Sequence, residues 1–284
     1  MPSPVMNEQV FESGGSVGVM DRPAPAAAAY HPGQTPPPQY PPVTATQGRT
    51  MSFGGTATAA GVMLVVLLAG GWFGWQQVSE VASPTQSDPA RVVGQLNNAG
   101  WLWISLIVGF GLAIFTAFKP MMARFTSLPY AIAEGVLLGV ISHLYNTQTQ
   151  GIAIQAILAT AGVFLIMLVL YGLRILRATP KFTKGVIAAT FGIAFMYLIG
   201  WITSLFTSSA LTFFNSPSLL SIGFSLVIVG VASMNLILDF DMIEKGVRNG
   251  APAAMDWYGA FGLTVTLVWL YLEMLRLLSK LQSR

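Results

Sequence analysis

The sequence contains no cysteine and only two histidines, His31 and His143. The lack of cysteine excludes a disulfide framework, thiolate metal sites and a cysteine nucleophile. Two histidines leave little material for a histidine-rich metal site, and the His-Glu-x-x-His helix of a metalloprotease is absent. A serine hydrolase would need His143 as its base, and "GFSL" at 223–226 lacks the second glycine of a nucleophile elbow. We therefore do not expect an enzyme.

Charge is also scarce. Charged residues make up 9% of the 284 residues, hydrophobic residues make up 54%, and the mean hydropathy is +0.63. A soluble globular domain carries roughly 25% charged residues, so this chain is not built to face water on all sides. The net charge of +3 does not indicate a nucleic-acid partner, because the basic residues lie in short loops.

Residues 1–50 form a proline- and alanine-rich tail that contains "RPAPAAAAYHPGQTPPPQYPPVTATQGRT". Such a stretch cannot bury enough apolar surface to offset its ordering entropy, so we predict a disordered, partly polyproline II segment. Within it, "PPPQYPP" is either a spacer or a ligand for an aromatic groove. The tail lacks the basic-then-apolar start of a cleavable signal peptide.

Residues 51–284 contain seven apolar segments, most of them near the roughly 20 residues that cross a bilayer. Lipid offers no hydrogen bonds to the backbone, so each segment is expected to be a helix. The sequence therefore predicts an all-α, multi-pass membrane protein with a seven-helix bundle. The segments span approximately residues 53–77, 100–118, 127–146, 152–173, 185–207, 217–240 and 257–278.

The distribution of lysine and arginine predicts the orientation. The loops after the second, fourth and sixth segments hold eight basic residues, and the alternate loops hold only Arg91. The positive-inside rule then places the even loops and the tail in the cytoplasm, which predicts a plasma or inner membrane location. Arg276, Lys280 and Arg284 disagree if the last segment spans fully. Either that terminus is an exception, or the last segment re-enters the membrane.

Four acidic residues lie inside apolar segments, where ionisable groups are functional candidates by default. Asp241 has Lys245 four residues on, as Glu244 has Arg248, so Asp241 is the weaker candidate. Asp239 has no such local partner, and we expect its partner on another helix. The four acids are Glu134, Asp239, Asp241 and Glu273.

The roles of the other two acids, Glu273 and Glu134, each have two possible interpretations. Glu273 is either functional or neutralised by Arg276 three residues on. Glu134 has no basic residue within a turn, so it is either protonated and hydrogen-bonded or part of a polar path. Gly135 and Gly139 beside it form a small-residue stripe that suits close helix packing.

Two carboxylates brought together in a low dielectric share a proton and become sensitive to pH. Protonated, such a pair closes a path by hydrogen bonding; ionised, it admits a cation. Carboxylate oxygens also suit Ca²⁺, but the six to eight oxygens of a tight site exceed what one pair provides. We expect no tightly bound cofactor, and any Ca²⁺ site formed by two of these acids would be weak.

Three stretches resemble the Bax inhibitor 1 / YccA family, the transmembrane Bax inhibitor motif proteins. They are "PYAIAEGVLLG", "ILDFDMIEKG" and "LYLEMLRLL", and the resemblance extends loosely over residues 53–281. The chain is similar to a bacterial-type member with a proline-rich extension. Glu273 stands where the family pattern has Asp, and the stretch "EKGVRNGAPAAMDWYGAFG" is longer than the usual connection.

The resemblance implies a seven-helix bundle with one helix at the centre. It also implies a pH-sensitive calcium or cation leak, a role in stress responses, or regulation of another membrane protein such as a quality-control protease. The family's aspartate pair falls on Asp239, with Asp241 as the competing alignment, and on Glu273. If the last helix began at Trp257, Glu273 would lie about 24 Å along it, which works against that pairing. The resemblance does not fix the oligomeric state.

Overall fold

The computed structural model describes residues 49–84, 92–204 and 218–283. Nearly all of the predicted disordered tail, including "PPPQYPP", lies outside these residues, and so does Arg91. The described chain from residue 49 onward belongs to one compact unit.

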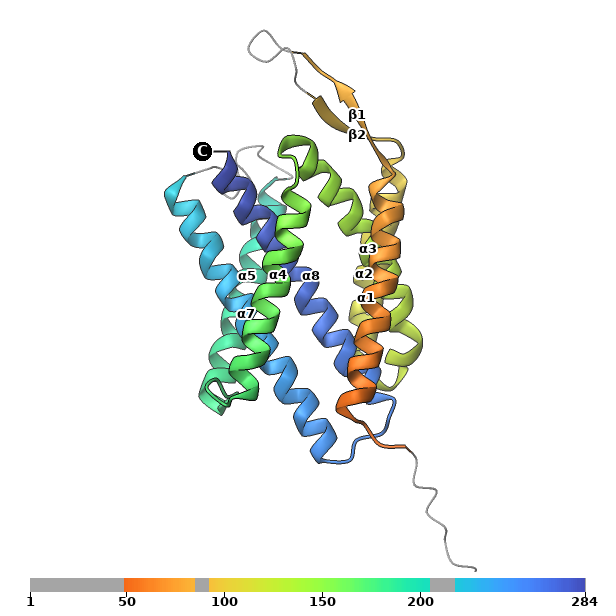
Figure 1. Ribbon diagram of the computed structural model, residues 1–284, viewed down its shortest axis with the longest axis vertical. Coiled ribbons are helices and arrows are strands. Elements are labelled where there is room, and N and C mark those ends of the chain that lie inside the picture. The colour runs from red at the N-terminus through yellow and green to blue at the C-terminus, as the bar shows by residue number, and fades with distance from the viewer. Residues whose placement is uncertain (1–48, 85–91, 205–217, 284) are drawn as a thin grey trace, which may run out of the picture. The chain divides into compact units, whose positions relative to one another are not determined.

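Seven of its helices are long and apolar enough to cross a membrane, which confirms the predicted helical fold (Figure 1). Each satisfies its own backbone, as a lipid environment requires. Their bounds are α1 Phe53–Trp75, α2 Ala99–Phe118, α3 Ala123–Gln148, α4 Ile152–Gly172, α5 Pro180–Ser204, α7 Leu219–Arg248 and α8 Met255–Gln282, with a 3₁₀ turn, Pro120–Met122, before α3.

Two short strands, β1 (Val78–Ala82) and β2 (Val92–Leu96), pair antiparallel after α1. The sequence analysis did not predict this hairpin. His143 of α3 lies under it, stacked on the Trp75 ring at a centroid distance of 4.3 Å. Its Nδ1 lies 2.8 Å from the Trp75 carbonyl oxygen, and its Nε2 lies 3.5 Å from Glu80 of β1. His143 therefore joins the hairpin to the bundle.

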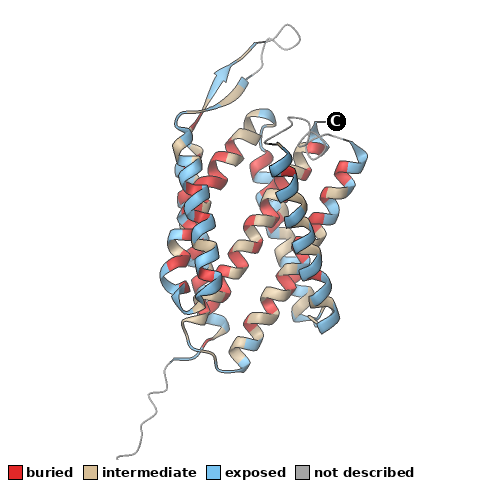
Figure 2. Ribbon diagram, turned by 180° about the vertical axis from the view of Figure 1, so that it is seen from behind, coloured by how far each residue is buried: buried red, intermediate tan, exposed pale blue. Residues whose placement is uncertain are grey.

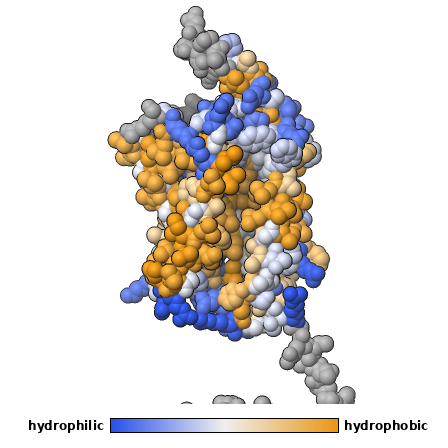
Figure 3. All heavy atoms as spheres, in the orientation of Figure 1, coloured by the Kyte–Doolittle hydropathy of each residue, from blue (hydrophilic) through white to orange (hydrophobic). Residues whose placement is uncertain are grey.

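Helix α8 is the central helix, as the family resemblance implies, because α1, α3, α4 and α7 all pack against it. Its side chains are mostly buried or half-buried, whereas α1, α2 and α5 present many exposed apolar residues (Figure 2). In the space-filling view an apolar belt crosses the helices and hydrophilic residues gather toward both ends (Figure 3). That distribution is the one expected of a protein surrounded by lipid.

The connection between α7 and α8 is shorter than the sequence suggested. Helix α7 continues to Arg248 and α8 begins at Met255, so only residues 249–254 are non-helical. The segment before α1 pairs with this connection through Met51 N–H, which donates to the Ala251 carbonyl at 2.7 Å. Asp256 then accepts hydrogen bonds from Ser52 N–H at 3.0 Å and from Thr56 Oγ1 at 3.1 Å. The start of α1 is thereby fixed to the start of α8.

Helix α8 runs without interruption from this connection to the end of the bundle that carries the hairpin (Figure 1). Of the two alternatives left open by the sequence, the uninterrupted helix favours a full span, because a re-entrant segment would have to turn back within the bundle.

Candidate functional site

Asp239 lies half-buried on the side of α7 that faces α8. Its Oδ2 accepts a hydrogen bond from Thr266 Oγ1 of α8 at 2.6 Å. The other oxygen, Oδ1, faces Gly262, one turn earlier on α8, where an added Cβ would make an ordinary contact at 3.4 Å. The expectation that Asp239 finds its partner on another helix is confirmed, and the partner is a hydroxyl.

Asp241 forms the local ion pair that its spacing predicts. Lys245 Nζ lies 2.5 Å from its Oδ2, and the lysine side chain is 64% exposed. Glu244 likewise pairs with Arg248 at 2.5 Å and accepts a hydrogen bond from Tyr171 of α4. These pairs lie near the C-terminal end of α7, and among the described residues no hydrogen bond or ion pair links them to Asp239.

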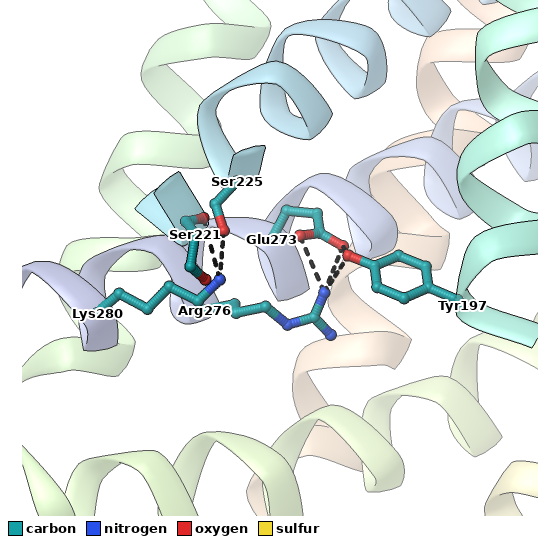
Figure 4. A network of polar contacts seen from close by, with 6 residues as sticks. All are labelled: Tyr197, Ser221, Ser225, Glu273, Arg276 and Lys280. Carbon is teal, nitrogen blue, oxygen red and sulfur yellow. Dashed lines mark hydrogen bonds and ion pairs between the residues drawn. The ribbon is translucent and has the colours of Figure 1, made fainter. Parts of the chain in front are cut away.

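Glu273 is 2% exposed and sits in a polar network between α5 and α8 (Figure 4). Arg276 Nη1 donates to both of its oxygens, at 2.9 and 3.1 Å. Tyr197 of α5 donates its hydroxyl to Glu273 Oε1 at 2.8 Å and accepts a hydrogen bond from Arg276. The carboxylate is therefore neutralised by its own helix, the pairing that the sequence left open.

Lys280 continues the same face of α8 toward its end (Figure 4). Its residue exposure is 4%, and Nζ donates to Ser225 Oγ at 2.7 Å and to the Ser221 carbonyl at 3.4 Å. The sequence analysis missed Lys280 and Tyr197 as site residues. Glu273, Arg276 and Lys280 are spaced at i, i+3 and i+7, which places all three on one helix face. This spacing could have identified Lys280 as a site residue.

Asp239 and Glu273 do not form a pair. Thr266, which binds Asp239, precedes Glu273 by seven residues on α8, a rise of about 10 Å. Leu236 of α7 and Leu270 of α8 lie between these levels and are fully buried. The shared-proton dyad expected from the sequence is therefore not made, because each carboxylate has different partners at a different height.

Glu134 lies apart from both carboxylates, at the contact of α3 with α2. It is half-buried, and an added Cβ at Gly109 of α2 would lie 3.1 Å from its Oε1. Within the described residues its carboxylate has no hydrogen-bond or ion-pair partner.

A line of polar side chains nevertheless runs along the contact of α5, α7 and α8. Asn235 of α7 donates to Thr190 Oγ1 of α5 at 2.8 Å, one turn from Asp239. We call this line the polar seam; its residues are Thr190, Tyr197, Ser225, Asn235, Asp239, Thr266, Glu273, Arg276 and Lys280. The seam offers oxygen atoms to a cation at two heights, and the layer of Leu236 and Leu270 separates them.

The described part of the chain holds no cluster of three or more histidine, aspartate or glutamate residues suited to a metal ion. A Ca²⁺ ion at Asp239 would meet one carboxylate and the hydroxyl of Thr266, far from the six to eight oxygens of a tight site. At Glu273 it would have to displace Arg276. Neither carboxylate is arranged as a high-affinity calcium site.

Comparison with known protein families gives a match over nearly the whole chain. The family described as Bax inhibitor 1 like matches residues 10–283 of the chain, beginning within the proline-rich tail. No curated protein and no solved structure matches.

Proposed function

The chain belongs to the Bax inhibitor 1-like family, and we propose that it forms a pH-sensitive leak path for calcium or other cations along the polar seam. The observation that carries this proposal is Asp239, an intramembrane carboxylate whose one hydrogen-bond partner among the described residues is the hydroxyl of Thr266. A carboxylate at this depth is costly, and such groups mark ion or proton paths in membrane proteins. Asp239 has no counter-cation within one helical turn on α7, so a passing cation is a suitable partner.

The described conformation corresponds to a closed path. Leu236 and Leu270 fill the interval between Asp239 and Glu273, and Arg276 occupies the oxygens of Glu273. Opening requires α7 and α8 to separate at this layer. The weak oxygen set at each height suits a leak better than storage, because conduction needs sites that release the ion.

The sign of the pH response follows from the charge of Asp239. When its carboxylate is protonated it loses its attraction for a cation, so flux falls as the pH falls. When it is ionised it draws a cation into the seam, so flux rises as the pH rises. Glu273 contributes less to this response while Arg276 neutralises it.

The proposed orientation places the tail and the loops after α2, α4 and α7 in the cytoplasm of a plasma or inner membrane. These three connections and the start of α1 lie at one end of the bundle (Figure 1). Arg276 and Lys280 would lie on the non-cytoplasmic side, which disagrees with the positive-inside rule. Both bind residues of the polar seam and neither lies in a loop, where the rule applies.

Purified protein in calcium-loaded liposomes tests conduction directly. We expect efflux that increases from acidic to neutral pH, with protein-free liposomes as the control. If wild-type protein gives no efflux above that control at any pH, conduction is ruled out.

The alternative function is a non-conducting regulator of another membrane protein, such as a quality-control protease. The closed leucine layer favours this alternative, because the seam has no continuous polar route in the described conformation. The tail would then serve as a docking element. Co-purification of partners with the full chain and with a chain lacking residues 1–50 tests it, and failure to recover a partner with either chain counts against it.

Both functions are non-catalytic. His143, the base that a hydrolase would need, is held by the Trp75 carbonyl and lies against its ring.

A further inference from the structure

A groove of about 560 Å³ lies between α1 and α4, on the other side of α8 from the polar seam. Its floor is formed by α8, which passes behind the gap between the two outer helices (Figure 1). In the space-filling view the surface is hollowed at this place (Figure 3). The volume is within the roughly 300–1,000 Å³ of typical ligand sites.

The groove and the seam occupy opposite faces of the same turns of α8. Val268 and Tyr271 line the groove, whereas Thr266 and Glu273 belong to the seam. Residues two apart on a helix are separated by about 200° around its axis. A ligand in the groove therefore does not touch Asp239 or Glu273, and the groove is a separate site.

The lining gives a ligand almost nothing to hydrogen-bond. Two of its hydroxyl groups donate to carbonyls in their own helices, Thr160 to Ala156 at 2.7 Å and Thr264 to Ala260 at 2.8 Å. The other two, Ser142 and Tyr271, bond each other at 2.6 Å. The remaining lining is aliphatic or aromatic and carries no charged side chain. Such a cavity excludes water and accepts apolar groups.

The groove is longer than one leaflet of a bilayer is thick, so it can hold the length of one acyl chain. Its lining on α1 runs from Ala60 to Trp75, a rise of about 22 Å. One leaflet of hydrocarbon is about 15 Å thick, half of the bilayer core. The groove reaches the hairpin end of the bundle at Trp72 and Trp75, and tryptophan is enriched where acyl chains meet headgroups.

The groove also opens sideways toward lipid. Its rims carry Leu68 at 61% exposure and Ile157 at 47%, whereas the floor residues Leu263 and Val268 are each 8% exposed. A molecule can thus enter from the bilayer without crossing a polar surface.

We propose that this groove binds one acyl chain of a phospholipid from the leaflet on the hairpin side. The chain fills the gap between α1 and α4, with its end against α8 and its headgroup beyond Trp75. The bound chain acts as a packing element that supports the central helix from the face opposite the seam. This proposal does not depend on ion conduction.

The test uses proteoliposomes that contain a phosphatidylglycerol with a photoreactive group near the end of one acyl chain, followed by mapping of the labelled residues. We expect labels to concentrate on the groove, at Leu67, Ile157 and Leu267. The reference surface is the outer face of α5, where Phe191 is 71% exposed and Phe195 is 63% exposed. Annular lipid alone would label this α5 face at least as strongly as the groove, and that result overturns the proposal.

A matched pair of variants sharpens the test. Ala161 lines the groove and is exposed, so Ala161→Phe places a ring in it. Ala194 of α5 is also exposed and lies outside the groove, so Ala194→Phe is the control. We expect Ala161→Phe to reduce groove labelling several-fold and Ala194→Phe to leave it unchanged. Unchanged labelling in Ala161→Phe, or protein–protein crosslinks at the groove in place of lipid labels, contradicts the proposal. If Ala161→Phe does not fold, the wild-type map decides.

Discussion

At the scale of single residues, Asp239 and Asp241 are two positions apart and yet have unrelated environments. An offset of two residues is about 200° on a helix, so one carboxylate faces α8 and the other lies on the opposite side of α7. Asp241 meets Lys245 in a largely exposed pair, and exposed pairs stabilise a fold by at most about 1 kcal/mol. In the part of the chain that the structure describes, Asp239 has the Thr266 hydroxyl as its one polar partner. Its position is better explained by function than by stability.

The pairing of Glu273 with Arg276 leads to a stability prediction. Arg276→Met leaves a buried carboxylate without its cation and should lower the free energy of unfolding by about 3 kcal/mol, the low end for a buried pair, because Arg276 is 28% exposed. Adding Glu273→Gln to the same chain should recover most of this loss. Unfolding of purified protein in detergent micelles measures both. Additive losses in the double variant would show that the two groups do not interact.

Sequence reasoning reached some of these contacts and not others, for a physical reason. The pairs Asp241–Lys245 and Glu244–Arg248 depend only on helical spacing, so the sequence predicts them. The partners Thr266, Tyr197 and Ser225 come from other helices than the charged groups that they bind, and their height relative to those groups depends on how the helices pack. The pairing of Asp239 with Glu273 that the family resemblance implies is not made in the structure, because the two carboxylates lie at different heights, as the length of the last helix already indicated.

At the scale of elements, α1 and α3 pack backbone against backbone. Gly139 of α3 lies against the carbonyl of Gly71, and Gly135 lies against that of Leu67. No side chain fits between the two helices at these points. The small-residue stripe predicted from the sequence is confirmed here: Gly135 and Gly139 let the two helices approach closely.

A glycine substitution tests this contact. Gly139→Ala forces α1 and α3 apart and should destabilise the bundle by about 1–3 kcal/mol, as overpacking does. Gly111 of α2 has no neighbouring atom within 4 Å of an added Cβ and is the control. Gly111→Ala should be neutral or stabilising by at most about 1 kcal/mol, through reduced freedom of the unfolded chain. Equal effects of the two substitutions on unfolding would contradict the close approach.

The sequence predicts the helices themselves better than their ends. An apolar run of this length forms a helix in lipid, because its backbone must be hydrogen-bonded within the segment. All seven predicted segments are therefore found as helices. Helix α7 nevertheless continues eight residues beyond the predicted Phe240, because Glu244 and Arg248 pair along it after the apolar run stops. The hairpin escaped prediction because its strands are short and partly polar.

At the scale of the whole molecule, the orientation in the membrane can be tested with thiol chemistry. The chain has no cysteine, so one introduced cysteine is its only thiol. Gln95 on the hairpin and Asn249 in the α7–α8 connection are both exposed and lie on opposite sides of the bundle in the proposed topology. In intact cells, an impermeant maleimide should label Gln95→Cys and not Asn249→Cys; both should react after permeabilisation. The reverse pattern would invert the topology.

The two faces of α8 differ in chemical character. One face carries the polar seam with Glu273 and the partner of Asp239, and the other forms the floor of the apolar groove. A central helix in contact with four neighbours cannot move without repacking both faces. In the proposed leak path, displacement of α8 from α7 is the movement that would open the seam.

The central claim is that Asp239 makes the cation path sensitive to pH, and calcium efflux from proteoliposomes over a pH series tests it most directly. Asp239→Asn is compared with Asp241→Asn, which removes an acid two residues away at the end of the helix. We predict that efflux through Asp239→Asn no longer varies with pH, whereas Asp241→Asn retains the rise from acidic to neutral pH seen in the wild type. An unaltered pH response in Asp239→Asn would contradict the claim.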